Sequence, residues 1–172
     1  MSSRTCYIGI GSNLGDRLEM MQRAVNLLCN DRSCDVRRVS GIYNTEPWGM
    51  KHQPPYLNAV VEIATNETPE LVYALCKYIE ETLGRKSTQK YFPRLIDLDI
   101  LFYGSERLRF SDVVIPHPRL QDRRFVLIPM HDLAPAFVHP ELHKSIEALL
   151  DECRDVGAVT KTDYHLAVSR NV

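Results

Sequence analysis

Two spacings of hydrophobic residues alternate along the chain and predict strands and helices in a definite order. Compact apolar runs, typical of buried strands, cover residues 6–10, 36–43, 57–64 and 95–103. Apolar residues at helical spacing follow the first and the third of these runs. The order strand, helix, two strands, helix, strand is the βαββαβ arrangement of a ferredoxin-like α+β fold, in which helices pack on an antiparallel sheet.

The two predicted helices have recognisable ends. Asp16 is placed to cap the first helix, an acid follows three residues later as in a capping box, and the helix is expected to end near Cys29. The second helix begins at residues 68–70, Thr-Pro-Glu, which supply an N-cap, a proline and an acid, and Gly84 is its natural stop. Each helix therefore lies between two predicted strands.

The remainder of the chain carries weaker signals. Residues 115–118, Ile-Pro-His-Pro, predict a turn, and Pro118 suits the first turn of a helix whose end Pro129 weakens or kinks. A short strand is predicted over residues 137–139 and a last short helix over residues 144–153. We therefore expect additions after the βαββαβ core.

Length and composition favour a single globular domain. The chain has 172 residues, of which 44% are hydrophobic and 25% charged, an ordinary balance for a globular protein. A domain typically holds roughly 100–200 residues, so we expect one domain over residues 1–155 and an extension of unknown role over residues 156–172. No run approaches the ~20 apolar residues that span a bilayer, and no membrane insertion is expected.

Net charge and cysteine content narrow the class of partner and the compartment. A net charge of -1 argues against general attraction to nucleic acid or anionic lipid, so any anion site must be local. The 5 cysteines are an odd number without a C-x-x-C pair, which fits neither a disulfide framework nor a zinc site. Because the first residues also lack the pattern of a signal peptide, we expect a reducing, cytoplasmic location.

Asp97 and Asp99 are the strongest candidates for chemistry. They stand two apart on a predicted strand, so both carboxylates project from one face. Mg²⁺ takes one or two carboxylates and fills its other positions with water and substrate phosphates. For the pair alone, a solvated polar face is the favoured interpretation. Arg94, which ends a cationic segment over residues 85–94, adds a phosphate-binding group and favours a nucleoside triphosphate site.

Three further motifs each leave two interpretations open. Residues 11–16, Gly-Ser-Asn-Leu-Gly-Asp, are placed to cradle phosphate, but they lack the ending of a P-loop and fit an ordinary turn better. The aromatic residues, amide and prolines of residues 45–58 either sandwich a flat polar ring or pack their loop onto the core. His117 contacts a phosphate or caps a turn, while Arg123 and Arg124 are surface charges unless one reaches the same anion.

Taken together, these segments resemble the 6-hydroxymethyl-7,8-dihydropterin pyrophosphokinase family of folate biosynthesis. The residues that carry the resemblance are 7–16 (YIGIGSNLGD), 56–60 (YLNAV), 93–101 (PRLIDLDIL) and 115–118 (IPHP), with Arg123 and Phe125. Four motifs in the right order with the right spacing form a specific signal, and it covers approximately residues 7–140.

The resemblance implies a reaction and a set of site residues. ATP would be the co-substrate, the hydroxymethyl oxygen of the pterin would attack its β-phosphorus, and AMP would leave, with two Mg²⁺ ions bridging the phosphates. Asp97 and Asp99 would hold the metals, and Arg94 and Arg85 would join them in catalysis. The implied ATP contacts are Glu80, Lys90, Arg94, Ile100, His117 and Arg123. The implied pterin contacts are Thr45, Pro47, Trp48, Tyr56, Asn58 and Phe125.

One segment departs from the family pattern and keeps alternatives open. Family members often carry Arg-Trp-Gly-Pro-Arg before the acidic strand, whereas residues 90–94 read Lys-Tyr-Phe-Pro-Arg, with bulky Phe92 in place of glycine. A catalytically silent nucleotide-binding relative is therefore one alternative. A ferredoxin-like RNA-binding module is another, although no RNP1-like aromatic pattern occurs and the acidic pair would repel a phosphate backbone. The expected partners are ATP and the pterin, without nucleic acid or membrane, in a monomer or weak homodimer.

Overall fold

An antiparallel sheet forms the centre of the computed structural model, which describes residues 3–47, 52–84 and 93–169. Its strands are β1 (Arg4–Ser12), β2 (Cys34–Val39), β3 (Tyr43–Thr45), β4 (Tyr56–Thr65), β5 (Asp97–Tyr103) and β8 (Val159–Lys161). The order across the sheet is β5-β1-β4-β3-β8, and β2 pairs with β4 beside β3. The α+β class expected from the sequence is confirmed.

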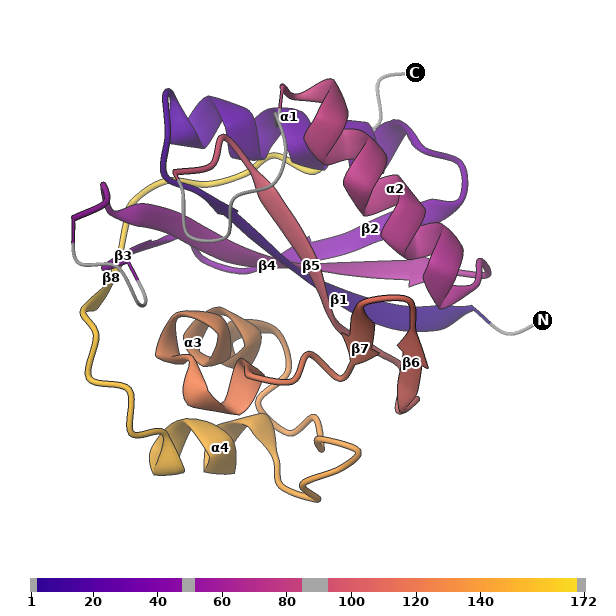
Figure 1. Ribbon diagram of the computed structural model, residues 1–172, viewed down its shortest axis with the longest axis vertical. Coiled ribbons are helices and arrows are strands. Elements are labelled where there is room, and N and C mark those ends of the chain that lie inside the picture. Colours follow the sequence, from indigo (N-terminus) through magenta and orange to yellow (C-terminus); the bar gives the residue numbers. More distant parts are fainter. Residues whose placement is uncertain (1–2, 48–51, 85–92, 170–172) are drawn as a thin grey trace.

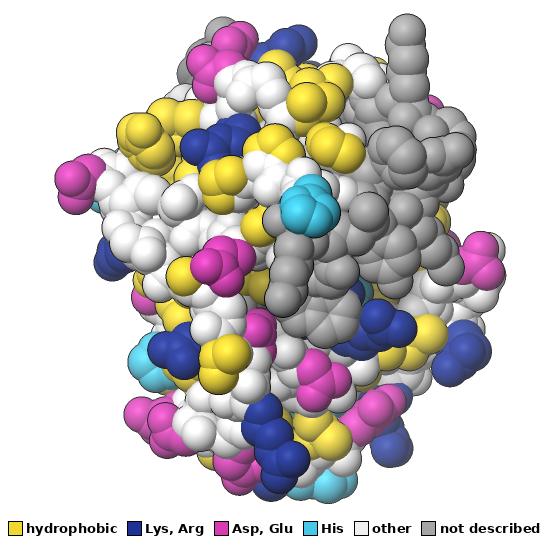
Figure 2. Space-filling view, turned by 60° about the vertical axis from the view of Figure 1, so that its left-hand side comes forward, with side chains coloured by type: hydrophobic (Ala, Val, Ile, Leu, Met, Phe, Trp, Pro, Cys, Tyr) yellow, Lys and Arg dark blue, Asp and Glu magenta, His cyan; other side chains and the backbone are white. Residues whose placement is uncertain are grey.

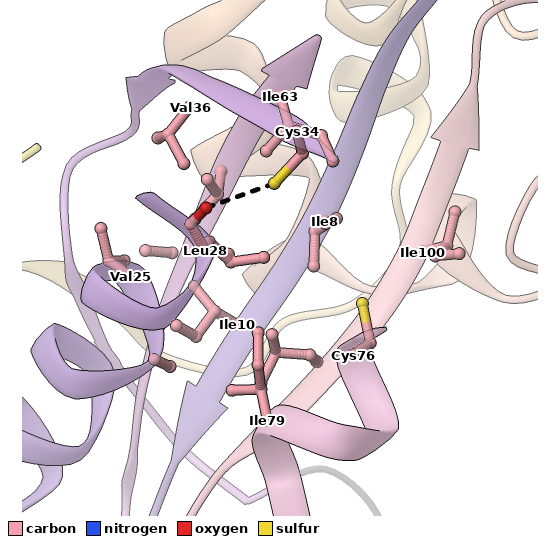
Figure 3. Packing of buried hydrophobic residues seen from close by; sticks show 14 of the residues in the cluster. Ile8, Ile10, Val25, Leu28, Cys34, Val36, Ile63, Cys76, Ile79 and Ile100 are labelled. Atoms are coloured by element: carbon pink, nitrogen blue, oxygen red, sulfur yellow. Dashed lines mark hydrogen bonds between the residues drawn. The ribbon is translucent and has the colours of Figure 1, made fainter. Parts of the chain in front are cut away.

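Helices cover both faces of this sheet (Figure 1). One face carries α1 (Arg17–Asn30) and α2 (Pro69–Thr82), and the other carries α3 (Arg124–Leu133) and α4 (Ile146–Glu152). Because side chains alternate along a strand, β1 contributes to two cores. Ile8 and Ile10 pack against α1 and α2, as Figure 3 shows, whereas Tyr7 packs in the second core with residues of α3 and α4.

The expected helix caps are confirmed. The Asp16 carboxylate accepts the Glu19 N–H at 3.0 Å, and the Thr68 hydroxyl accepts the Leu71 N–H at 3.4 Å. Pro69 occupies the first turn of α2, where its missing N–H costs nothing. These local bonds fix where each helix starts and hence where β1 and β4 end.

The prediction of a single strand over residues 36–43 is wrong, because the structure has two strands there, β2 and β3, with a break between them. Between the two strands, the Ser40 hydroxyl accepts the Val60 N–H at 2.8 Å. The Gly41 N–H donates at 3.0 Å to the Asp132 carboxylate of α3 instead of to a strand. The Ser40 N–H still donates to the Val60 carbonyl at 2.9 Å, so side-chain acceptors replace only part of the backbone pairing over this short stretch.

Three expectations for the C-terminal half are also corrected. The helix expected from Pro118 is a 3₁₀ turn, η1 (Leu120–Asp122), followed by α3, which runs through Pro129 without ending. Leu127, Met130 and Leu133 of α3 are buried and hold the turns on both sides of the proline. The strand expected over residues 137–139 is an isolated bridge from Val138 to Ser145.

Two elements were not expected, and the last expected helix is confirmed. The unexpected ones are the hairpin of β6 (Leu108–Phe110) with β7 (Val113–Ile115), and β8 in the C-terminal extension. The last helix, α4, begins after Ser145, whose hydroxyl accepts the Ala148 N–H at 3.1 Å. Within the described ranges, no helix is long and apolar enough to cross a membrane.

Candidate functional site

A cavity of about 190 Å³ lies between the sheet and the start of α3. Its floor is the face of β1, β4 and β5 that does not carry α1 and α2, and its walls come from β3 and from the first turn of α3. The lining residues are Gly9, Ile10, Gly11, Thr45, Glu46, Gln53, Tyr56, Asn58, Ala59, Val60, Arg94, Asp97, Asp99, Leu101, His117, Arg123, Phe125 and Val126.

Asp97 and Asp99 lie on the floor of the cavity. Leu98 and Ile100, which alternate with them on β5, are buried in the core on the opposite face, as a period of two requires. Across the sheet, Asp97 is paired with Gly11 and Asp99 with Gly9. Because a glycine stands opposite each acid, no neighbouring side chain of β1 fills the space beside the carboxylates.

Arg94 joins this acidic pair. Its guanidinium donates to the Asp97 carboxylate at 3.0 Å, and both side chains are largely shielded from solvent. Burial acts to lower the pKa of Arg94, but the carboxylates of Asp97 and Asp99 outweigh it and the pKa is raised. Arg94 therefore remains a cation inside the cavity, where a hydrogen-bonded positive charge binds phosphate oxygens well.

His117 also lines the cavity and is held by its own loop. Its backbone N–H donates to the Leu101 carbonyl at 3.0 Å, and its Nδ1 accepts the Arg119 N–H at 3.3 Å. This bond assigns the imidazole proton to Nε2. Burial lowers the pKa of His117, the positive charges of Arg123 and Arg119 lower it further, and Asp99 opposes them. The neutral ring thus has one N–H to offer a ligand.

The other half of the cavity suits a flat polar ring. Tyr56, at the start of β4, and Phe125, in the first turn of α3, both line it, and the Arg123 guanidinium lies 5.8 Å from the Phe125 ring centroid. The Asn58 amide donates to the Thr45 hydroxyl at 2.7 Å. This bond orients the amide in the cavity that Tyr56 and Phe125 also line, where an amide can form hydrogen bonds with the polar edge of a ring.

Asn13 connects the two loops that border the cavity, a role that the sequence analysis missed. Its side chain is buried and donates to the Gln53 side chain at 3.2 Å and to the Pro54 carbonyl at 3.3 Å. Its amide oxygen accepts the Arg94 N–H at 2.7 Å. Only its place in the Gly-Ser-Asn-Leu-Gly-Asp segment hinted at a special position, since its partners lie far away in the sequence.

Some of the predicted site residues lie elsewhere. Glu80 is buried in α2, where its carboxylate accepts the Leu98 N–H at 2.7 Å and the Lys77 ammonium at 2.8 Å. Ile100 is buried in the core on the helical side, and Pro47 is not among the residues that line the cavity. Three others, Trp48, Arg85 and Lys90, lie outside the described residues, as does Phe92.

The residues on the cavity floor can hold a divalent cation only together with a ligand. Among the described residues, no group of three or more His, Cys, Asp and Glu side chains forms a ready metal site. The two carboxylates suit a cation that takes its remaining oxygens from water and phosphate, which is typical of Mg²⁺. On the face shown in Figure 2, acidic and basic side chains are interspersed. This face therefore shows no broad basic patch among the described residues, and the cations that could bind an anion are those that line the cavity.

An α+β fold whose cavity combines an acidic pair, cations and aromatic side chains fits an enzyme that transfers phosphoryl groups to a small ring compound. The sequence model of the 7,8-dihydro-6-hydroxymethylpterin-pyrophosphokinase (HPPK) family matches residues 7–135. The chain belongs to this family, and its class of activity is that of a pyrophosphokinase, an ATP-dependent diphosphotransferase. The resemblance found in the sequence is thereby confirmed.

Relatives of similar length carry the name of this activity. The 2-amino-4-hydroxy-6-hydroxymethyldihydropteridine pyrophosphokinase of Bacillus subtilis is 40% identical over 127 residues, which are 74% of this chain and 76% of that protein. The protein of the same name from Aquifex aeolicus is 33% identical over 148 residues, or 86% and 91% of the two chains.

Other relatives are much longer. Folic acid synthesis protein fol1 of Schizosaccharomyces pombe is 38% identical over 155 residues, which are 90% of this chain and 21% of that protein. In the crystal structure of Plasmodium falciparum HPPK-DHPS wild type with pteroate, the match covers 87% of this chain and 42% of that chain, with a TM-score of 0.72. At 15% identity this likeness shows the fold alone.

Proposed function

We propose that the chain transfers the β,γ-diphosphate of ATP to the hydroxymethyl oxygen of 6-hydroxymethyl-7,8-dihydropterin and releases AMP. One observation carries the proposal. A single cavity joins an acidic pair and phosphate-binding cations to a pocket for a flat polar ring. The new O–P bond forms at the β-phosphorus, and the bond from the β-phosphorus to the bridging oxygen of AMP breaks, so no covalent enzyme intermediate is needed.

The acidic pair is proposed to bind two Mg²⁺ ions through Asp97 and Asp99. When bound, such ions neutralise the phosphate oxygens and orient them for in-line displacement. The chain itself supplies the two carboxylates and leaves the space beside them open, because Gly9 and Gly11 stand opposite.

Positive charge and one neutral donor are proposed to hold the phosphates. Arg94 and Arg123 bring cations to the cavity, and the neutral imidazole of His117 donates its Nε2–H. These groups stabilise the charge that develops on the transferred diphosphate and on the leaving AMP. Since Arg94 is also bonded to Asp97, its position is tied to that of the metal ligands.

The pterin is proposed to lie between Tyr56 and Phe125, with Asn58 on its polar edge and Thr45 holding the Asn58 amide. Pro47 and Trp48 would complete this pocket. For ATP, Glu80 and Ile100 would lie near the nucleoside, while Lys90 would contact ATP and Arg85 would take part in catalysis. These six assignments rest on the family resemblance.

The proposal extends to the fold family and the state of the chain. A ferredoxin-like core is supported by the order β5-β1-β4-β2 and by the two helices, α1 and α2, on one face. A domain over residues 1–155 with additions after the core, acting as a monomer or weak homodimer in the cytoplasm, completes the proposal.

The test incubates the purified chain with ATP, Mg²⁺ and 6-hydroxymethyl-7,8-dihydropterin and measures AMP and ADP separately. Pterin-dependent AMP without matching ADP is the expected result. Asp97→Ala and Asp99→Ala are expected to lose turnover at least about a hundredfold, with an unchanged melting temperature. Asp151→Ala, which removes an exposed acid of α4, is the matched control and should leave turnover unchanged. ADP as the product would contradict diphosphoryl transfer.

A further inference from the structure

The C-terminal segment from Asp155 to Ala167, here called the C-terminal strap, contacts both walls of the cavity. It lies outside residues 7–135, which the family model matches. From the end of α4 it passes along the edge of the sheet beside β3 and continues to α1 on the opposite face (yellow in Figure 1). Its contacts fall at three places in order along the chain.

The first contact is at the start of α3. The Asp155 carboxylate accepts the Arg124 N–H at 3.0 Å with one oxygen and the Gly157 N–H at 2.9 Å with the other. An acceptor at the first turn satisfies an N–H that has no partner within the helix and favours the helix dipole. The same turn presents Arg123 and Phe125 to the cavity, so the strap fixes the turn that carries this wall.

The second contact is along β3. Val159 pairs with Thr45 and Lys161 with Tyr43, and the Glu46 N–H donates to the Ala158 carbonyl at 3.2 Å. β3 has only 3 residues and is paired with β4 on its other side. A strand this short has few bonds of its own, so the strap supplies half of its pairing. Thr45 in turn holds the Asn58 amide.

The third contact anchors the far end of the strap. The backbone N–H and the hydroxyl of Thr162 both donate to the Ile42 carbonyl at 2.9 Å. The Gln22 amide of α1 then clamps Ala167, donating to its carbonyl at 2.9 Å and accepting its N–H at 2.8 Å. Leu166 packs on the core between these bonds. The strap is thus fixed at both ends and cannot slide along β3.

We propose that the C-terminal strap is a positioning element that holds the Thr45 wall and the Phe125 wall at the separation that a pterin ring requires. The inference rests on the proposed function, because it concerns the pterin half of the same cavity. The β3 contact supports the wall that carries Thr45 and Glu46, whereas the Asp155 contact supports the turn with both Phe125 and Arg123. Loosening the β3 contact is therefore expected to weaken binding of the pterin alone, whereas loosening the Asp155 contact is expected to weaken binding of both substrates.

The test measures binding of 6-hydroxymethyl-7,8-dihydropterin and of the α,β-methylene analogue of ATP by calorimetry, with Mg²⁺ present. Thr162→Pro removes both donors to Ile42 and is expected to raise the Kd of the pterin about fivefold without changing that of the analogue. Thr162→Ser keeps both donors and should bind like the unmodified chain. Asp155→Ala is expected to raise both constants about fivefold, and Asp155→Asn, which keeps one of the two acceptor oxygens, should restore them in part.

The outcomes separate this inference from the proposed function. All constants are measured well below the melting temperature of each variant, where a purely structural role would leave them unchanged. Should Thr162→Pro not fold, Thr162→Val, which loses only the hydroxyl, is expected to raise the Kd of the pterin about twofold. Unchanged pterin affinity in Thr162→Pro and Asp155→Ala, or in Thr162→Val where it is used, overturns the positioning role alone. An unmodified chain that binds no pterin overturns the proposed function and the strap's role with it.

Discussion

Replacing Gly11 by alanine tests whether the bare backbone of β1 sets the position of the Asn58 amide. A β-carbon at Gly11 would stand 2.5 Å from the Asn58 amide oxygen, whereas ordinary contact begins at 3.4 Å. The amide cannot withdraw freely, because it is bonded to the Thr45 hydroxyl at 2.7 Å. We therefore expect Gly11→Ala to break or distort this bond.

The expected cost follows from that single bond. A hydrogen bond of this kind contributes about 1 kcal/mol, which corresponds to about a fivefold change in a dissociation constant. Calorimetric titration with 6-hydroxymethyl-7,8-dihydropterin should show this loss for Gly11→Ala. Gly9→Ala is the control for pterin affinity alone, because its β-carbon would lie 3.4 Å from the Leu101 side chain and beside Asp99 rather than the Asn58 amide. That contact is ordinary, and the Asn58 amide is untouched.

A double-mutant cycle isolates the cause. In an Asn58→Ala background the atom that clashes with the new β-carbon is gone, so Gly11→Ala should cost almost nothing further in pterin affinity. The reasoning is refuted if Gly11→Ala binds the pterin as tightly as the unmodified chain. It is refuted equally if the loss persists in the Asn58→Ala background.

Three further predictions concern positions outside the metal ligands. Asn13→Ala should raise the KM of both substrates severalfold, because it releases Arg94 from the loop that contains Gln53. KM values equal to those of the unmodified chain would contradict this coupling. Glu80→Ala should lower the free energy of unfolding by about 2 kcal/mol, measured in urea, since the Leu98 N–H loses its acceptor; Glu81→Ala is its exposed control. Burial lowers the pKa of His139, so the unfolded chain binds a proton at this residue more readily than the folded chain does. The free energy of unfolding should therefore keep its full value above about pH 6.5 and fall as the pH drops below it. His139→Asn should weaken that acid dependence, and an unchanged pH profile would contradict it.

Features governed by neighbours in the sequence were predictable. The starts of α1 and α2 follow from Asp16 and Thr68, whose side chains bond N–H groups three residues away. The shared face of Asp97 and Asp99 follows from the period of a strand. Both kinds of signal act over a few residues, so one sequence was sufficient to find them.

Features governed by distant partners were not predictable. The break between β2 and β3 depends on Val60 and Asp132, and although the Ser40-Gly41 dipeptide favours a turn, nothing near it in the sequence specifies these partners. β8 has only 3 residues and forms because β3 offers it a free edge. The role of Asn13 likewise depends on loops that approach it only in the folded chain. In each case the partner, not the local pattern, decides the conformation.

The sequence Ile8-Gly9-Ile10-Gly11 shows how one strand serves both stability and chemistry. Alternation places the isoleucines in the core beneath α1 and α2 and the glycines on the cavity floor opposite the two acids. Glycine weakens a strand, yet a side chain at Gly11 would collide with the Asn58 amide. Substitutions that strengthen the strand at this position therefore act against the site. Because the isoleucines pack in the core and the acids line the cavity, changes to the acids should alter turnover while the fold persists.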